Sequence, residues 1–252
     1  MNKNECREQA RRIMAQLPAA ALAGRGQAFA QALEALPEYA GAHTVFCYLS
    51  VDKEPETRPL IARALAAGKT VCAPVCIARG VMRARRLRSL ADLVPGRYDI
   101  PVPPDDEPWI EPGQIDFAVV PCVACGRDGT RLGHGAGFYD RFLAGGHFTR
   151  AAVCHSELLL DTVPVDAHDE PMDVIVTQGQ TLRFAGRQGA RCPRCSIPCC
   201  RPLPWRCCWG WALCPRTTRG FRRWPPPPCW KAWRFCCRCW CSGCSTAARK
   251  HR

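Results

Sequence analysis

The chain has 252 residues and a formal charge of +13, from 35 lysines and arginines against 22 aspartates and glutamates. The charge is unevenly distributed, because residues 183–252 hold 16 of the basic residues and no acidic one, which leaves residues 1–182 with a formal charge of −3. The first part is therefore typical of a mildly acidic globular protein, and the overall charge does not by itself indicate binding to nucleic acid.

The sequence also bears on location. No run approaches the roughly 18–20 apolar residues that a membrane span needs, and the polar amino terminus does not resemble a secretory leader. Seven of the 20 cysteines fall in residues 1–182, several within apolar strand patterns, as is typical of buried thiols in a reducing compartment. We therefore expect a cytoplasmic protein without a membrane partner.

Cys122 and Cys125 form a Cys-x-x-Cys pair, a spacing that occurs in metal and redox sites. No second pair stands at zinc-site spacing in the same part of the chain. The pattern therefore favours two buried thiols over a metal or redox site.

Within residues 1–182, the sequence predicts helices at 3–17 and 19–36, followed by a strand at 44–50. A helix at 54–67 and a strand at 70–76 come next. Residues 79–104 show no clear period. A strand at 115–120, a helix at 137–144 and strands at 151–155 and 174–176 follow. Strands that are apolar on both faces and alternate with helices predict an α/β domain of three layers, with a mostly parallel sheet and helices on both faces.

A glycine loop stands between the 115–120 strand and the next helix. Gly133, Gly135 and Gly137 can bring bare backbone N–H groups close to an anion, and Arg131 and Arg141 flank them. Asp140 offers a hard oxygen ligand for a divalent metal. The spacing is neither the dinucleotide fingerprint nor a Gly-Lys-Ser/Thr phosphate loop. The pattern predicts a nucleoside triphosphate–magnesium site, and the alternative is a glycine-rich turn that only caps an amphipathic helix.

Four stretches in this order resemble the motifs of the 5-formyltetrahydrofolate cyclo-ligase family, also called methenyltetrahydrofolate synthetase. They are Lys3-Asn-Glu-Cys-Arg7, Tyr48-Leu-Ser-Val-Asp-Lys-Glu-Pro-Glu-Thr57, the segment from Val120 through the glycine loop to Leu143, and His168-Asp-Glu-Pro-Met-Asp-Val-Ile-Val-Thr177. The resemblance covers about residues 1–183. It departs from the family at Cys125-Gly126, where Phe-Asp is usual, at Phe138, where tyrosine is usual, and at Leu158, where glutamine is usual.

The resemblance implies ATP-dependent cyclisation of 5-formyltetrahydrofolate to 5,10-methenyltetrahydrofolate, with ATP as co-substrate and Mg²⁺ as cofactor. It implies catalytic roles for Arg131, Tyr139 and Asp140, and magnesium ligation by Asp140 and Asp169. The ATP-binding residues that it implies are Lys3, Asn4, Glu5, Cys6, Arg7, Arg131, Leu132, Gly133, His134, Gly135, Ala136, Gly137, Phe138 and Tyr139. The folate-binding residues that it implies are Val51, Glu56, His134, Gly135, Ala136, Gly137 and Phe138.

Residues 184–252 differ in composition from the rest of the chain. Residues 183–252 hold thirteen cysteines and seven of the eight tryptophans, together with the run Pro225–Pro228, and show no helical or strand period. We interpret this tail as disordered or out-of-frame sequence, and a zinc or nucleic-acid module is the alternative.

Three other functions stay open from the sequence: a non-catalytic nucleotide-binding protein on the same fold, a nucleic-acid-binding protein acting through the tail, and a sugar-phosphate isomerase. We expect small-molecule substrates and no nucleic-acid partner, and the sequence leaves the oligomeric state open.

Overall fold

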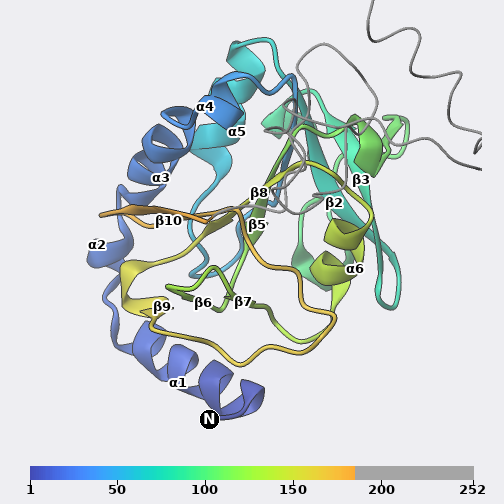
Figure 1. Cartoon of the computed structure of the whole chain (residues 1–252). Helices are drawn as coiled ribbons and strands as arrows, with labels where there is room; N and C mark the ends of the chain where they lie inside the picture. Colours follow the sequence, from blue (N-terminus) through green and yellow to red (C-terminus); the bar gives the residue numbers. More distant parts are fainter. Residues whose placement is uncertain (185–252) are drawn as a thin grey trace, which may run out of the picture. The chain divides into compact units, whose positions relative to one another are not determined.

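The structure is a computed structural model and describes residues 1–184, which contain one eight-stranded sheet (Figure 1). The strand order is β11-β10-β8-β5-β1-β2-β3-β4. The pairs from β10 to β2 are parallel, and β11, β3 and β4 add antiparallel pairs at the two edges. The predicted mostly parallel sheet is confirmed. Its strands are β1 (Thr44–Cys47), β2 (Thr70–Ala78), β3 (Val81–Leu87), β4 (Trp109–Ile110), β5 (Phe117–Pro121), β8 (Thr149–Val153), β10 (Val174–Val176) and β11 (Thr181–Arg183).

A second, three-stranded sheet has the order β7-β6-β9. Its strands are β6 (Ala124–Gly126), β7 (Arg131–Leu132) and β9 (Leu159–Leu160). The β6–β7 hairpin stands between the end of β5 and the glycine loop. The sequence analysis placed the loop directly after the central strand, whereas in the structure the loop leaves the short strand β7.

Helices cover both faces of the large sheet, so the three-layer arrangement is confirmed. They are α1 (Lys3–Gln16), α2 (Ala19–Leu22), α3 (Arg25–Glu34), α4 (Pro37–Ala40), α5 (Arg58–Ala66) and α6 (Phe138–Ala144), with short 3₁₀ turns at Leu90–Asp92, Arg97–Asp99, Pro112–Gln114 and Ser156–Leu158.

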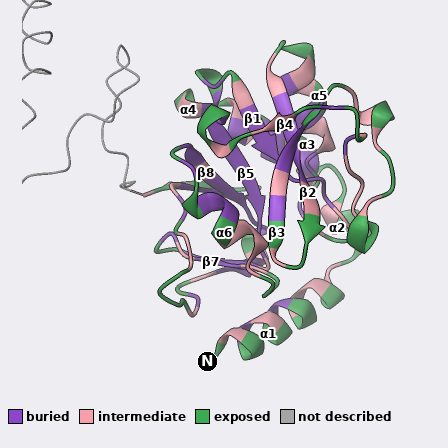
Figure 2. Cartoon of the chain, turned by 90° about the vertical axis from the view of Figure 1, so that its right-hand side faces the viewer, coloured by how far each residue is buried: buried purple, intermediate pink, exposed green. Residues whose placement is uncertain are grey.

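Alternate residues of the central strand β5 divide the core in two. Phe117 and Val119 pack with α3, α4 and α5, while Ala118 and Val120 pack with α1 and α6. Figure 2 shows the central strands almost wholly buried between these layers. A strand that is buried on both faces has an uninterrupted run of apolar residues, and such a run in β5 is why the sequence predicted a parallel sheet.

Two helix predictions need correction in detail. The expected helix over 19–36 is broken into α2 and α3, because Gly24 takes a left-handed conformation with φ +75°. The helix expected from Glu54 begins only at Arg58, after the N-cap Thr57. Glu54 and Glu56 therefore lie in the loop that precedes α5 and not in its first turn.

The sequence did not predict β3 or the short strands β4, β6, β7, β9 and β11. β3 is the longest of these and pairs antiparallel with β2, within a stretch that had no recognised period because arginines alternate with small and apolar residues. The guanidinium groups of Arg83 and Arg85 lie 4.6 and 4.1 Å from the centre of the Trp109 ring on β4. The contact with an aromatic ring stabilises these arginines in a strand, where charged side chains are not expected from the sequence pattern.

The expected tail, residues 184–252, lies outside the described part of the chain except for Phe184. Among residues 1–184, no helix combines the length and apolarity that a bilayer crossing would require.

Candidate active site

A cavity of about 480 Å³, the first cavity, opens beside the glycine loop. Three segments that are far apart in the sequence line it: the start of α1, the stretch from Arg131 to Asp140, and the turn 166–169. Two of these segments come from motifs on which the family resemblance rests, and Asp169 belongs to a third. The fold therefore brings together parts of three of the four motifs.

The start of α1 is fixed by a capping box. The Asn2 side chain accepts hydrogen bonds from the Asn4 and Glu5 N–H groups, and Glu5 accepts from the Asn2 N–H. This cap directs Lys3, Asn4 and Arg7 to the cavity wall, whereas Cys6 turns into the core and is fully buried. Arg7 donates from Nε to the Gly133 carbonyl at 2.9 Å, so α1 is tied to the glycine loop.

The glycine loop needs its glycines for conformation and for space. Gly135 and Gly137 have φ values of +105° and +65°, which side-chain-bearing residues rarely adopt. A Cβ on Gly135 would lie 3.3 Å from the Arg7 guanidinium. Arg141 donates to the Ala136 carbonyl at 2.6 Å and to the Gly80 carbonyl at 2.7 Å, so it braces the loop and does not line the cavity.

An ion pair forms one wall of the first cavity. The Arg131 Nη2 atom lies 2.6 Å from Asp140 Oδ1, and the two side chains are only 2% and 15% exposed. Arg131 also donates to the Pro121 carbonyl at 3.2 Å, at the end of β5. The Tyr139 ring centre lies 5.8 Å from this guanidinium, but Tyr139 packs against the core and does not line the cavity.

In the same lining, Lys3 contacts two carboxylates. Its Nζ lies 2.7 Å from Asp166 and 2.5 Å from Asp169, and the Asp166 N–H donates to Asp169 at 2.7 Å. Burial would raise the pKa of Asp169, but the Lys3 ammonium and the Asp166 N–H outweigh it and hold that pKa below its ordinary value. Asp169 is therefore held as the anion.

The oxygen donors suit a hard divalent cation. Asp140 and Asp169 line the same cavity, and one ligand atom each from Asp166, His168 and Asp169 lies within 4.8 Å of the others. The Lys3 ammonium lies between two of these carboxylates, Asp166 and Asp169, which shows that they bind positive charge. This donor set is consistent with the predicted magnesium site.

A second cavity of about 260 Å³ shares Arg7 with the first, since this side chain lines both. Its wall is largely apolar, with Ala10 and Met14 from α1, Val51 from the loop after β1, and Leu158. His134 closes one side, with Nε2 3.2 Å from Glu54 Oε1. Leu158, one of the departures from the family motifs, therefore stands at this pocket.

Glu56 lies outside the lining of both cavities. The Ser50 hydroxyl donates to its carboxylate at 2.6 Å and the Arg58 N–H at 3.0 Å. Burial works to raise the pKa of Glu56, but these donors and the Arg58 guanidinium leave the pKa lowered.

The predicted residues divide by position. Those that line the first cavity are Lys3, Asn4, Arg7, Arg131, Leu132, Gly133, Gly135, Gly137, Asp140 and Asp169, whereas Val51 and His134 line the second. Glu5, Cys6, Glu56, Ala136, Phe138 and Tyr139 line neither. Sequence reasoning missed Asp166, which is close to His168 and Asp169 in the chain and offers a ligand atom within 4.8 Å of theirs. It also missed Ala10, Met14 and His155, which carry no such signal.

The sequence profile of the 5-formyltetrahydrofolate cyclo-ligase family matches residues 1–178. The chain belongs to this family. The 5-formyltetrahydrofolate cyclo-ligase of Escherichia coli K12 is 35% identical over 165 residues, which is 63% of this chain and 91% of that protein. The enzyme of the same name from Saccharomyces cerevisiae is 30% identical, over 69% of this chain and 94% of its own.

Solved structures agree with the sequence comparison. The NMR structure of 5,10-methenyltetrahydrofolate synthetase from Aquifex aeolicus has a TM-score of 0.67 and 27% identity, and the match covers 78% of this chain and all of that one. The synthetase from Mycoplasma pneumoniae, at 22% identity and a TM-score of 0.57, has the same fold. The family predicted from the four motifs and the fold predicted from the alternation of strands and helices are confirmed.

Proposed function

We propose that this cyclo-ligase family member uses ATP to convert 5-formyltetrahydrofolate to 5,10-methenyltetrahydrofolate, releasing ADP and phosphate. Family membership and the names of its relatives support the activity. The observation that carries the proposal is the first cavity. It joins Lys3 and Arg7, the glycine loop, and the Arg131–Asp140 pair in a single pocket next to an apolar one.

The reaction must activate an amide-like formyl oxygen, which is a poor leaving group. The terminal phosphoryl group of ATP passes to that oxygen and ADP leaves. The 10-nitrogen of the same molecule then attacks the formyl carbon and gives up its proton to the departing phosphate or to water, the carbon–oxygen bond breaks, and phosphate departs. Intramolecular attack requires orientation more than a strong base. Phosphoryl transfer requires placed positive charge and backbone donors more than covalent chemistry from the protein.

The first cavity has the groups for the phosphoryl step. Backbone N–H groups between Gly133 and Gly137 would surround the phosphates, since glycine lets them approach closely. Lys3 and Arg7 would contact the nucleotide from α1, with Arg7 held on the loop by its bond to Gly133. Arg131 would neutralise charge on the transferring group, because Asp140 and the Pro121 carbonyl hold its guanidinium in place.

Charge balance favours a bound cation. The three cationic side chains of the lining, Lys3, Arg7 and Arg131, are matched by three carboxylates, at Asp140, Asp166 and Asp169. A triphosphate would then enter a pocket with almost no formal charge of its own. Asp140 and Asp169 would hold Mg²⁺, which would offset phosphate charge and orient the phosphate oxygens.

The second cavity would hold the folate ring system beside the phosphates. Val51 and Leu158 provide apolar contact, and His134 and Glu54 provide polar atoms. Glu56, Ala136 and Phe138, which the family resemblance implied as folate contacts, lie outside this lining, so we assign the ring contacts to Val51, His134 and Leu158. We also propose a cytoplasmic location, which fits the seven free thiols of the described residues.

The deciding experiment mixes the purified chain with 5-formyltetrahydrofolate, ATP and magnesium chloride, and follows the absorbance of methenyltetrahydrofolate. Product that forms only when all three are present supports the proposal. Nucleotide binding without product would favour the non-catalytic alternative. No product here, together with ATP-independent turnover of a sugar phosphate in a separate assay, would favour the isomerase.

A further inference from the structure

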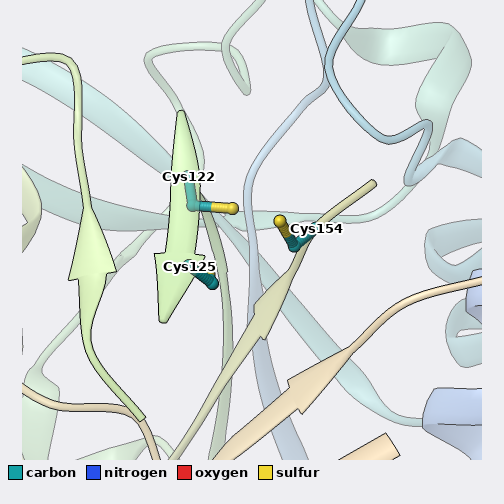
Figure 3. Close-up of side chains that lie close together, drawn as sticks. All are labelled: Cys122, Cys125 and Cys154. Atoms are coloured by element: carbon teal, nitrogen blue, oxygen red, sulfur yellow. The ribbon is translucent and has the colours of Figure 1, made fainter. Parts of the chain in front are cut away.

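Three thiols meet where two neighbouring strands end. Cys122 follows β5, Cys154 follows β8, and Cys125 lies in β6, with all three sulfur atoms within 4.8 Å of one another. Figure 3 shows the Cys122 and Cys154 sulfurs pointing towards each other. Cys125 and Cys154 are completely buried, whereas Cys122 is 6% exposed and lines the second cavity. A small reagent therefore reaches Cys122 first.

We propose that this group is an oxidation site, in which a hydroperoxide oxidises Cys122 and Cys154 then forms a disulfide with it. The cyclisation chemistry uses no thiol, so this site goes beyond the activity proposed above. The sequence alone could not reveal it, because Cys154 is distant from the Cys-x-x-Cys pair and joins it only through strand pairing.

Strand register selects Cys154 as the partner. β5 and β8 are parallel neighbours in which Pro121 pairs with Val153, and Cys122 and Cys154 are the next residues on each strand. Neighbouring strands lie about 4.8 Å apart, and a disulfide needs a Cα separation of about 4.4–6.8 Å. The Cys122 sulfur already reaches across to β8, since it lies 3.2 Å from the Val153 carbonyl oxygen. The bridge can therefore form with little backbone movement.

The surroundings favour the thiolate of Cys122. Hydrogen bonds from the Cys125 and Cys154 thiols, and the positive charge of Arg131, hold the pKa of Cys122 below its ordinary value although burial opposes them. The pKa values of Cys125 and Cys154 are raised. Because the thiolate is the nucleophile, Cys122 is the thiol that attacks the peroxide, and its neighbours remain protonated until the second step.

The chemistry balances with one hydroperoxide. The Cys122 sulfur attacks a peroxide oxygen, the O–O bond breaks, and hydroxide leaves, so that Cys122 becomes a sulfenic acid. The Cys154 sulfur then attacks the Cys122 sulfur, the S–O bond breaks, and the oxygen leaves as water with the proton of Cys154. The two thiols lose two electrons and two protons in total, and hydrogen peroxide is reduced to two waters.

The test treats the full chain with hydrogen peroxide, blocks the remaining thiols, and maps peptides by mass spectrometry. We expect a Cys122–Cys154 linked peptide that is lost on reduction. Cys122 should react at least about tenfold faster than Cys72, because each unit of pKa changes the thiolate fraction about tenfold. Cys72 is the matched control, being fully buried with a pKa raised by that burial.

Two variants complete the test. Cys154→Ser should abolish the bridge and increase trapping of the Cys122 sulfenic acid by dimedone, whereas Cys72→Ser should leave both unchanged. A bridge from Cys122 to Cys125 would overturn the choice of partner. Oxidation of Cys122 no faster than of Cys72, or a purified chain with zinc held by these three sulfurs, would overturn the oxidation site itself.

Discussion

Arg131 and Asp140 form an ion pair of 2.6 Å on the wall of the first cavity, and the guanidinium has almost no solvent exposure. Each side chain depends on the other. Asp140 fixes the direction of Arg131, and without that carboxylate a nearly buried positive charge would have no ionic partner.

Replacing Asp140 with Asn should therefore reduce turnover by about a hundredfold or more, because both the position of Arg131 and a proposed magnesium ligand are affected. Stability should fall by about 3 kcal/mol, the usual cost of breaking a buried pair. The cyclisation assay over a magnesium titration, with urea unfolding of the same samples, measures both. Asp161→Asn is the control, since Asp161 is 98% exposed and lies 3.8 Å from Arg127. Near-normal turnover by Asp140→Asn would remove Asp140 from the site.

Gly135→Val should weaken ATP binding by about tenfold or more. Its φ of +105° strains any side chain by about 1–3 kcal/mol, and a Cβ there would meet Arg7. Calorimetric titration with ATP measures the effect. Gly68→Val separates strain from blockage, because Gly68 also has positive φ but faces open space. If Gly135→Val binds ATP like the unaltered chain, the glycine loop does not contact phosphate.

Lys3→Met should raise the KM for ATP by about tenfold, because one of three lining cations is lost and Asp166 and Asp169 are left without their ammonium partner. Steady-state kinetics at varied ATP concentration measures it. Arg12→Met removes the same charge from the exposed side of α1 and should leave KM unchanged. If the two variants have the same KM for ATP, Lys3 does not contact the nucleotide.

Glu157 should contribute a pH-dependent stability. Two contacts from Arg25, at 2.8 and 2.9 Å, lower the pKa of Glu157 from 4.5 to about 2. Because the folded pKa is depressed, this stabilisation is complete above pH 4.5 and is lost as the pH falls towards 2. Glu157→Gln should cost about 1 kcal/mol at pH 7 and progressively less below pH 4.5. Urea unfolding at several pH values measures this, and a pH-independent difference would contradict the ion pair.

A chain that ends at Phe184 should keep the turnover of the full chain. The Phe184 N–H donates to the Asp173 carbonyl at 2.9 Å, and its ring packs over Gly129. Ending the chain at Gln180 would remove β11 and should lower thermal stability. Assays of the three chains in parallel would show this, and a loss of turnover on ending at Phe184 would give residues 185–252 a role.

The sequence predicted the layers of the fold well, because strands such as Phe117–Pro121 are apolar on both faces and helices flank them. It missed β3, whose arginines are accommodated by Trp109 on a strand far along the chain. It missed the break at Gly24, since a single glycine in an alanine-rich run does not reveal its φ angle. The spacing of apolar residues indicates which face of a single helix or strand is buried. The arginines of β3 depend instead on a contact from another strand, and the break at Gly24 depends on a backbone angle.

The candidate site was likewise predicted where motifs indicated it and missed where it depends on packing between elements. Residues of the glycine loop and α1 were predicted from motifs, and the structure places most of them around one cavity. Motif position could not distinguish Arg7, which lines the cavity, from Cys6 beside it, which faces the core, because that depends on the rotation of α1. Arg141 was expected to flank the glycine loop with positive charge; it lies beside the loop, but its guanidinium donates to the carbonyls of Gly80 and Ala136.

Arg7 borders both cavities, and its helix supplies walls to each. Any tilt or sliding of α1 that tightens one pocket must also reshape the other. The affinities for the two occupants are then thermodynamically coupled, and the coupling is reciprocal. A single amphipathic helix would thus make the binding of two unlike molecules cooperative.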